Sequence, residues 1–361
     1  MSADVGWRML SAGFEDLLLM RCLLAVCLAA AAATNIRVSA AAPPVSGPSD
    51  AGMSVDSDSG ERLWSDSQAT LEQELRDSTH PLDWALLANS PDLFETGRTG
   101  ESDEALLRRA ANALPNEVLP QWLFALKSVY GVEGPAATSD IASLTRLDGD
   151  NAASWLLALV LASKHGDADG IADALTQMAS SSRYDDHFAA LLHAWMDVYD
   201  RYPSAAQGDD PATKEIARFT AALARASAAP MPQYQALIKA CTPGGGDAMD
   251  DDRKAHCIRV GRLMLNDGMT LFARSIGFAV LRHVGGEVPS AADLQQRRAI
   301  DWYMYHATVA TESSEGEAAA MRAYAQDWRA LDDEAEVMKR ALRSRGLPIE
   351  PPAGWVAPAR Q

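Results

Sequence analysis

The chain lacks the short motifs by which many enzymes are recognised in a sequence. Its 361 residues contain no Walker-type phosphate loop, no nucleophile elbow, no H-E-x-x-H, no dinucleotide fingerprint and no C-x-x-C. These absences exclude families whose active sites are built on local motifs. They leave open an active site assembled from distant residues. We therefore predict no catalytic, cofactor-binding or metal-ligating residue.

Lysine is scarce, and positive charge as a whole is outnumbered. Only 6 of the 32 basic residues are lysines, and 49 acidic residues bring the formal net charge to -17. Such a surface repels phosphate backbones and anionic lipid headgroups, so we predict no nucleic-acid partner. The preference for arginine over lysine, together with abundant alanine, indicates GC-rich coding and favours a bacterial source.

The apolar segment near the N-terminus is too short to span a membrane. It follows Arg21 and covers the twelve residues Cys22–Ala33, whereas a spanning helix needs about 20. A run of this length after a basic residue is typical of a secretory signal. We predict a cleaved signal peptide over residues 1–40, with no stable membrane span after cleavage. An uncleaved anchor and a buried helix are the alternatives.

The cleavage site and the start codon each have two candidates. Small residues in Val38-Ser39-Ala40 favour cleavage before Ala41, and Ala31–Ala33 is the second candidate. The acidic residues upstream are unusual for a signal, which makes Met20 an alternative start. In either case the mature protein is expected to be periplasmic or secreted.

Only two of the four cysteines would remain after cleavage. Cys22 and Cys27 lie in the signal, so the exported chain keeps Cys241 and Cys257. An even pair in an exported protein predicts one disulfide. Two separate buried thiols are the alternative.

Apolar spacing and capping residues in the rest of the sequence indicate helices, and we predict an all-α fold. Residues 41–62 offer almost nothing to bury and are expected to form a disordered linker. Apolar spacing of three and four predicts helices over 102–114, 151–164 and 168–178. A capping box at Ser314–Glu317 is expected to open one last long helix that stops before Gly346. Residues 347–361 form a proline-rich tail whose Trp355 is expected to pack back on the domain or, alternatively, to recruit a partner.

Aromatic residues recur at a fixed interval in the first half. Trp122, Trp155 and Phe188 are each 33 residues apart, and Trp84 lies 38 residues before Trp122. A period of this length is typical of stacked helical hairpins. We interpret these four aromatics as packing anchors between successive helix pairs.

One segment resembles the tetratricopeptide repeat family. The resemblance rests on Leu147-Asp-Gly-Asp-Asn151 followed by Trp155, Ala158 and Leu159, and it covers about residues 82–200. Leucine replaces the glycine that this family favours four residues after each anchor. The resemblance implies an α-α superhelix over 63–202, continuing into a helical C-terminal region at 203–346 that carries the disulfide. An irregular helical bundle is the alternative.

The histidines and the acidic run do not indicate a metal site. His187 and His193 are six residues apart, which would place them on different faces of one helix. Asp250–Asp252 stand where a helix begins, and capping accounts for them.

The expected function follows by analogy with the fold. Arrays of helical hairpins commonly hold proteins or peptides on an extended concave surface. The sequence therefore favours an exported scaffold that binds a protein or peptide in the bacterial cell envelope. A periplasmic enzyme of hydrolase type and a small-ligand-binding protein are the alternatives.

Overall fold

The computed structural model confirms the all-α class. It describes residues 57–90, 101–131, 135–203, 211–243, 249–284, 289–309 and 317–357, and within them it contains 15 helices and no strand. The expected signal peptide at 1–40 lies outside the described residues. Within the described ranges, no helix combines the length and the apolarity needed to cross a bilayer.

The helices are α2 (Ser57–Asp77), α3 (Pro81–Asn89), α4 (Asp103–Ala113), α5 (Val118–Gly131), α6 (Pro135–Leu147), α7 (Ala152–His165), α8 (Ala168–Ser180), α9 (Phe188–Arg201), α10 (Pro211–Ala228), α11 (Tyr234–Ala240), α12 (Asp251–Asp267), α13 (Leu271–Val284), α14 (Ala291–Val309), α15 (Glu317–Ala330) and α16 (Glu334–Ser344).

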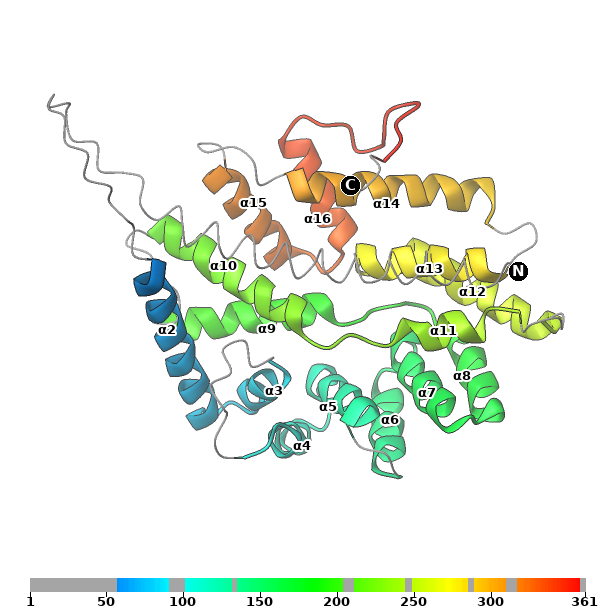
Figure 1. Cartoon of the computed structure of the whole chain (residues 1–361), viewed down its shortest axis with the longest axis horizontal. Coiled ribbons are helices and arrows are strands. Elements are labelled where there is room, and N and C mark those ends of the chain that lie inside the picture. Colours follow the sequence, from blue (N-terminus) through cyan, green and yellow to red (C-terminus); the bar gives the residue numbers. More distant parts are fainter. Residues whose placement is uncertain are drawn as a thin grey trace, which may run out of the picture.

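Helices α3 to α8 form three consecutive hairpins. The pairs α3/α4, α5/α6 and α7/α8 each pack together, and α4 contacts α5 as α6 contacts α7. Figure 1 shows these six helices as a row along the lower edge of the molecule. The pairwise pattern then changes, because α8 packs against α12 while α9 pairs with α10 and also contacts α3 and α15.

Later segments of the chain cover one side of this row, the first-helix side, which is formed by the first helix of each hairpin: α3, α5 and α7. Helix α9 packs on α3, α11 packs on α7, and the connection from α10 to α11 crosses α5. Figure 1 shows α9, α10 and α11 running between the row and the upper helices. The surface on which a stacked array would hold a ligand is therefore largely occupied within the same chain.

Side-chain caps account for the helix ends that the sequence predicts well. Ser102 accepts a hydrogen bond from Ala105 N at 3.3 Å, and Asp250 accepts one from Arg253 N at 2.8 Å. The predicted helices at 102–114, 151–164 and 168–178 correspond to α4, α7 and α8 within two residues at each end.

Two predicted boundaries differ from the structure. Helix α2 begins at Ser57, inside the segment expected to be a linker up to residue 62. Acidic residues near the start of a helix favour its dipole, and Asp58 and Glu61 stand there in the sequence. The expected long last helix is divided into α15 and α16 because Asp333 caps α16 by accepting from Ala335 N at 2.8 Å. The proposed start of that helix at Ser314 lies outside the described residues.

Backbone hydrogen bonds join four interhelical loops into a row. Ala152 N donates to Arg183 O at 2.9 Å, Met269 N to Tyr184 O at 3.2 Å, and Glu334 N to Met269 O at 2.9 Å. These bonds connect the starts of α7, α9, α13 and α16, which lie far apart in the sequence. These loop-to-loop bonds fix neighbouring hairpins relative to one another, although they do not form a β-sheet.

The C-terminal tail packs against α14. The Trp355 ring lies 5.1 Å from that of Trp302 and 6.2 Å from that of Tyr305, between ring centroids. Arg298 Nε donates to Trp355 O at 3.0 Å. Trp355 thus packs back on the domain, as predicted.

Helices α12 and α13 approach each other closely at two glycines. A Cβ added at Gly277 would lie 2.5 Å from Leu265 N and 2.6 Å from Gly261 O. Alanine normally favours a helix over glycine by about 1 kcal/mol. Here the backbone clash should outweigh that gain, so we expect Gly277→Ala to lower the free energy of unfolding by about 1–3 kcal/mol in urea denaturation.

A matched control for this substitution is available at the end of α5. A Cβ at Gly131 would meet nothing within 4 Å, so Gly131→Ala should leave stability unchanged within about 0.5 kcal/mol. A Gly277→Ala protein as stable as the wild type would contradict the close approach.

Candidate functional site

The four predicted anchors do not occupy equivalent environments. The indole nitrogens of Trp84 and Trp155 donate to carbonyl groups six residues upstream, Ser78 O at 2.9 Å and Gly149 O at 2.8 Å. Both rings are half-buried. Each of these two tryptophans therefore holds the loop before its own helix.

The other two anchors are buried against distant segments. The Trp122 ring lies edge-on to His187, with 4.9 Å between ring centroids, and Phe188 packs edge-on to Trp328 at 5.7 Å. Trp122 therefore contacts the loop before α9, and Phe188 contacts α15. The equal sequence interval hides two different packing roles.

A buried carboxylate joins the loops before α7 and α9. Asp148 Oδ2 accepts hydrogen bonds from Asn151 Nδ2 at 2.8 Å and Ser154 Oγ at 2.6 Å, and His187 Nε2 lies 3.1 Å away. A carboxylate only accepts, so His187 Nε2 donates. The guanidinium of Arg183 pairs with the other oxygen. Burial raises the pKa of Asp148, but the hydrogen bonds from His187, Ser154 and Asn151 outweigh it and hold the pKa below its usual value.

Asn151 completes this connection through its side chain. Its Oδ1 accepts from Ala153 N at 3.1 Å, which caps α7, and from Asp185 N at 2.9 Å. Its Nδ2 also donates to Asp185 O at 2.8 Å. One amide therefore satisfies backbone groups of two loops that are 34 residues apart in the sequence.

This polar cluster is not arranged for nucleophilic catalysis. A serine nucleophile must give its proton to a histidine, which a carboxylate then orients. Ser154 and His187 instead both donate to the same Asp148 oxygen, and Ser154 is fully buried. The geometry stabilises the junction of two loops and leaves no room for a substrate at the hydroxyl.

His187 and His193 serve separate contacts. His187 precedes α9 with φ 57°, in the left-handed region, and its backbone N–H donates to Asp185 Oδ1 at 2.8 Å. His193 lies within α9, with Nδ1 3.7 Å from Asp332 Oδ1 and Nε2 bonded to Trp328 O. In the part of the chain that the structure describes, no group of three or more His, Cys, Asp or Glu side chains is placed to hold a metal ion.

The disulfide pair connects α11 to α12. The Sγ atoms of Cys241 and Cys257 are 2.04 Å apart, a bonded distance, and both residues are fully buried. Cys241 follows the last residue of α11, and Cys257 lies in the second turn of α12. The bond belongs to the core and offers no exposed thiol.

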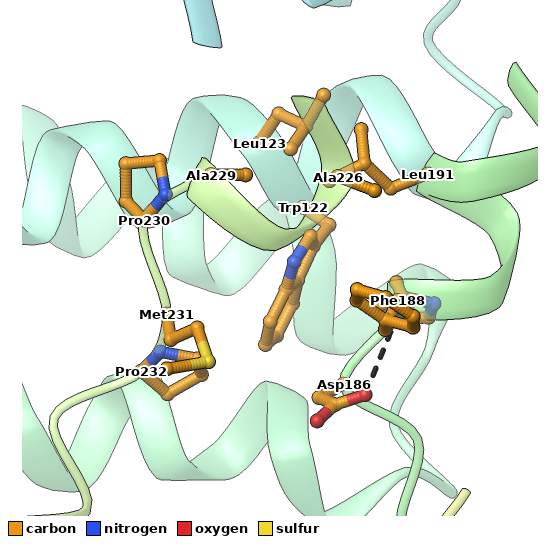
Figure 2. A pocket seen from close by; sticks show the side chains of 11 residues that line it. Trp122, Leu123, Asp186, Phe188, Leu191, Ala226, Ala229, Pro230, Met231 and Pro232 are labelled. Atoms are coloured by element: carbon orange, nitrogen blue, oxygen red, sulfur yellow. Dashed lines mark hydrogen bonds between the residues drawn. The ribbon is translucent and has the colours of Figure 1, made fainter. Parts of the chain in front are cut away.

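A pocket lies where the α10–α11 connection crosses α5. Figure 2 shows the Trp122 ring between Pro230, Met231 and Pro232 on one side and Asp186 and Phe188 on the other. The remaining lining residues, which are mostly apolar, are Leu123, His187, Leu191, Ala226 and Ala229. The segment that connects α10 to α11 therefore covers this face of α5.

An open groove of about 560 Å³ runs along the outer face of α12. It is lined by Ser181, Ala255, Ile258, Arg259, Arg262, Leu263, Asn266 and Asp267. The α12 residues recur at intervals of three and four, so they share one stripe of the helix. Ile258 and Leu263 are half-buried at its centre, and the two arginines are exposed beside them. This α12 groove combines an apolar floor with a polar edge that carries Arg259 and Arg262 together with Asp267.

No protein-family model, no curated protein and no solved structure matches the chain.

Proposed function

We propose that the protein is an exported helical scaffold that binds a segment of a protein or peptide in the bacterial cell envelope, and that the α12 groove is its binding surface. The groove carries the proposal because its mixture of apolar centre and polar rim is typical of protein-binding surfaces. Arg259 and Arg262 favour a segment that combines apolar and acidic side chains.

Two features support an exported location. Cys22–Ala33 has the length of a secretory signal core, and Cys241 and Cys257 are at bonding distance. Disulfides persist mainly in oxidising compartments such as the periplasm. These observations favour the envelope over the cytoplasm.

The test compares captures made with matched variants. Arg259→Glu should reduce the recovery of a specific partner from an envelope extract at least tenfold, because it reverses the charge beside the apolar floor. Arg259 is exposed, so this single substitution should leave the fold intact, whereas Arg262 stays unchanged because it lies 3.7 Å from the buried carboxylate of Asp293. Recovery is quantified by mass spectrometry against the wild type.

The control carries the same charge change away from the groove. Arg282 is exposed at the end of α13, and Arg282→Glu should retain wild-type recovery. A capture profile that is identical for the wild type and the groove variant, or empty for both, would refute the proposal.

A further inference from the structure

The segment Ala229–Gln233, here called the strap, interrupts the helices for a reason that its sequence explains. Pro230 and Pro232 fix their own φ angles and disfavour helix at Ala229 and Met231. The strap therefore separates α10 from α11 as a proline-containing peptide without helix, and it ends in a tight turn in which Tyr234 N donates to Pro232 O at 3.0 Å. Aromatic grooves commonly recognise proline-containing peptides.

Helix α5 holds the strap through backbone groups. The hydroxyl of Tyr130 accepts from Gln233 N at 2.5 Å and donates to Met231 O at 3.3 Å. Burial raises the pKa of Tyr130 far above its usual value, although the bond from Gln233 N lowers it, so the hydroxyl keeps its proton and both roles. These contacts use main-chain atoms, which any extended peptide can offer.

Side chains of the strap line one pocket together with the Trp122 indole. Figure 2 shows Pro230, Met231 and Pro232 arranged beside the indole of Trp122. Trp122 is 3% exposed, so the strap and its surroundings shield nearly all of the ring from water. The Trp122 ring can therefore contact the side chains of a peptide, while the Tyr130 hydroxyl, two turns further along the same helix, bonds to its main chain.

We infer that the α5 face formed by Trp122 and Tyr130 is a binding site for extended proline-containing peptides, and that the strap occupies it within the same chain. A tethered segment acts at an effective concentration in the millimolar range, so it competes strongly with a free peptide. The site opens to other peptides when the strap is displaced. The inference stands independently of the α12 groove.

The direct test removes the strap and returns it as a free peptide. Ala229–Gln233 is replaced by Gly-Ser-Gly-Ser-Gly, and the probe is a fluorescent Ala-Ala-Pro-Met-Pro-Gln peptide, followed by polarisation. We expect the replaced protein to bind this peptide at least tenfold more tightly than the wild type does. Adding Tyr130→Phe to the replaced protein should weaken binding at least tenfold, because the hydroxyl is lost.

Two controls keep the outcome clear. A peptide in which alanine replaces both prolines should bind at least tenfold more weakly, and circular dichroism checks that each variant is folded. The inference would be overturned if the folded strap-replaced protein did not bind the probe peptide, or if it bound the proline and alanine peptides equally.

A second measurement covers the case in which the replaced protein does not fold. In the otherwise wild-type chain, Tyr130→Phe should accelerate hydrogen exchange at the Gln233 amide at least tenfold, because that N–H loses its acceptor. Tyr305→Phe, at a tyrosine that is 38% exposed on α14, should leave this amide unchanged. Equal exchange in the wild type and Tyr130→Phe would show that α5 does not hold the strap.

Discussion

Asp148→Ala should lower the free energy of unfolding by about 3–5 kcal/mol, the cost of removing one partner from a buried ionic cluster. The substitution leaves donors of Asn151, Ser154 and His187 without their shared acceptor and removes one carboxylate from Arg183. Urea denaturation followed by circular dichroism should show the midpoint moving to a lower concentration.

The neighbouring Asp150 supplies the matched control. Its Oδ2 lies 3.4 Å from Arg183 Nε, but its side chain is 64% exposed, so Asp150→Ala should cost at most about 1 kcal/mol. If both substitutions had the same small effect, Asp148 would not be the centre of the junction between the two loops.

The Asp148 cluster also predicts a dependence on pH. Because the folded pKa of this carboxyl is lowered, the ionised form contributes stability that is present above its unfolded pKa, near 4. That contribution is lost as the pH falls through the folded value. The wild type should therefore lose stability more steeply below about pH 4 than Asp148→Ala does. Parallel curves for the two proteins would contradict the lowered pKa.

The sequence predicts helix ends well where the determinant is local. Ser102 and Asp250 accept hydrogen bonds from backbone N–H groups three residues on, so their capping roles can be predicted from neighbouring residues in the sequence. The break between α15 and α16 has a local determinant as well, the cap of Asp333 on Ala335 N, but it is held in place by distant partners. Asp333 Oδ2 accepts from Arg274 at 2.8 Å, and Glu334 Oε2 accepts from Leu271 N at 2.8 Å, 63 residues away. No local signal specifies those bonds.

The Asp148 cluster could not be found by inspecting helix faces. The sequence favours one helix for His187 and His193, but His187 stands before α9 in a left-handed conformation. Its carboxylate partner is 39 residues away. A partial signal was present in Asp148 and Asn151 at the turn before Trp155, since short polar side chains in a turn can bond to backbone groups nearby. Which loop lies nearby depends on tertiary packing.

The 33-residue interval predicts local hairpins better than it predicts their neighbours. Trp155 and Phe188 each mark the start of a helix, yet α8 packs on α12 and α9 returns to α3. A period in sequence constrains each hairpin's own packing, whereas the order of stacking depends on which apolar faces remain. Here the later helices cover the first-helix side of the row, so the ligand surface expected from the repeat is filled within the chain.

Opening the Cys241–Cys257 bond should lower the free energy of unfolding by about 3 kcal/mol, the chain-entropy value for a loop of about 15 residues. The two cysteines are 16 residues apart, and the bond ties the end of α11 to α12. Because the unfolded chain loses the cross-link, its conformational freedom increases while the packed core keeps its contacts. Urea denaturation with and without dithiothreitol measures the effect on one and the same sequence.

The double variant Cys241→Ala/Cys257→Ala separates the bond from other actions of the reductant. It should match the reduced wild type to within about 1 kcal/mol, the difference reflecting two small buried cavities, and it should not respond to dithiothreitol. Alkylation of the unreduced protein under denaturing conditions should add no label at either cysteine. Full labelling at both sites, or a wild type indifferent to reductant, would show that the two sulfurs are free in the isolated protein and would remove one of the two supports for export.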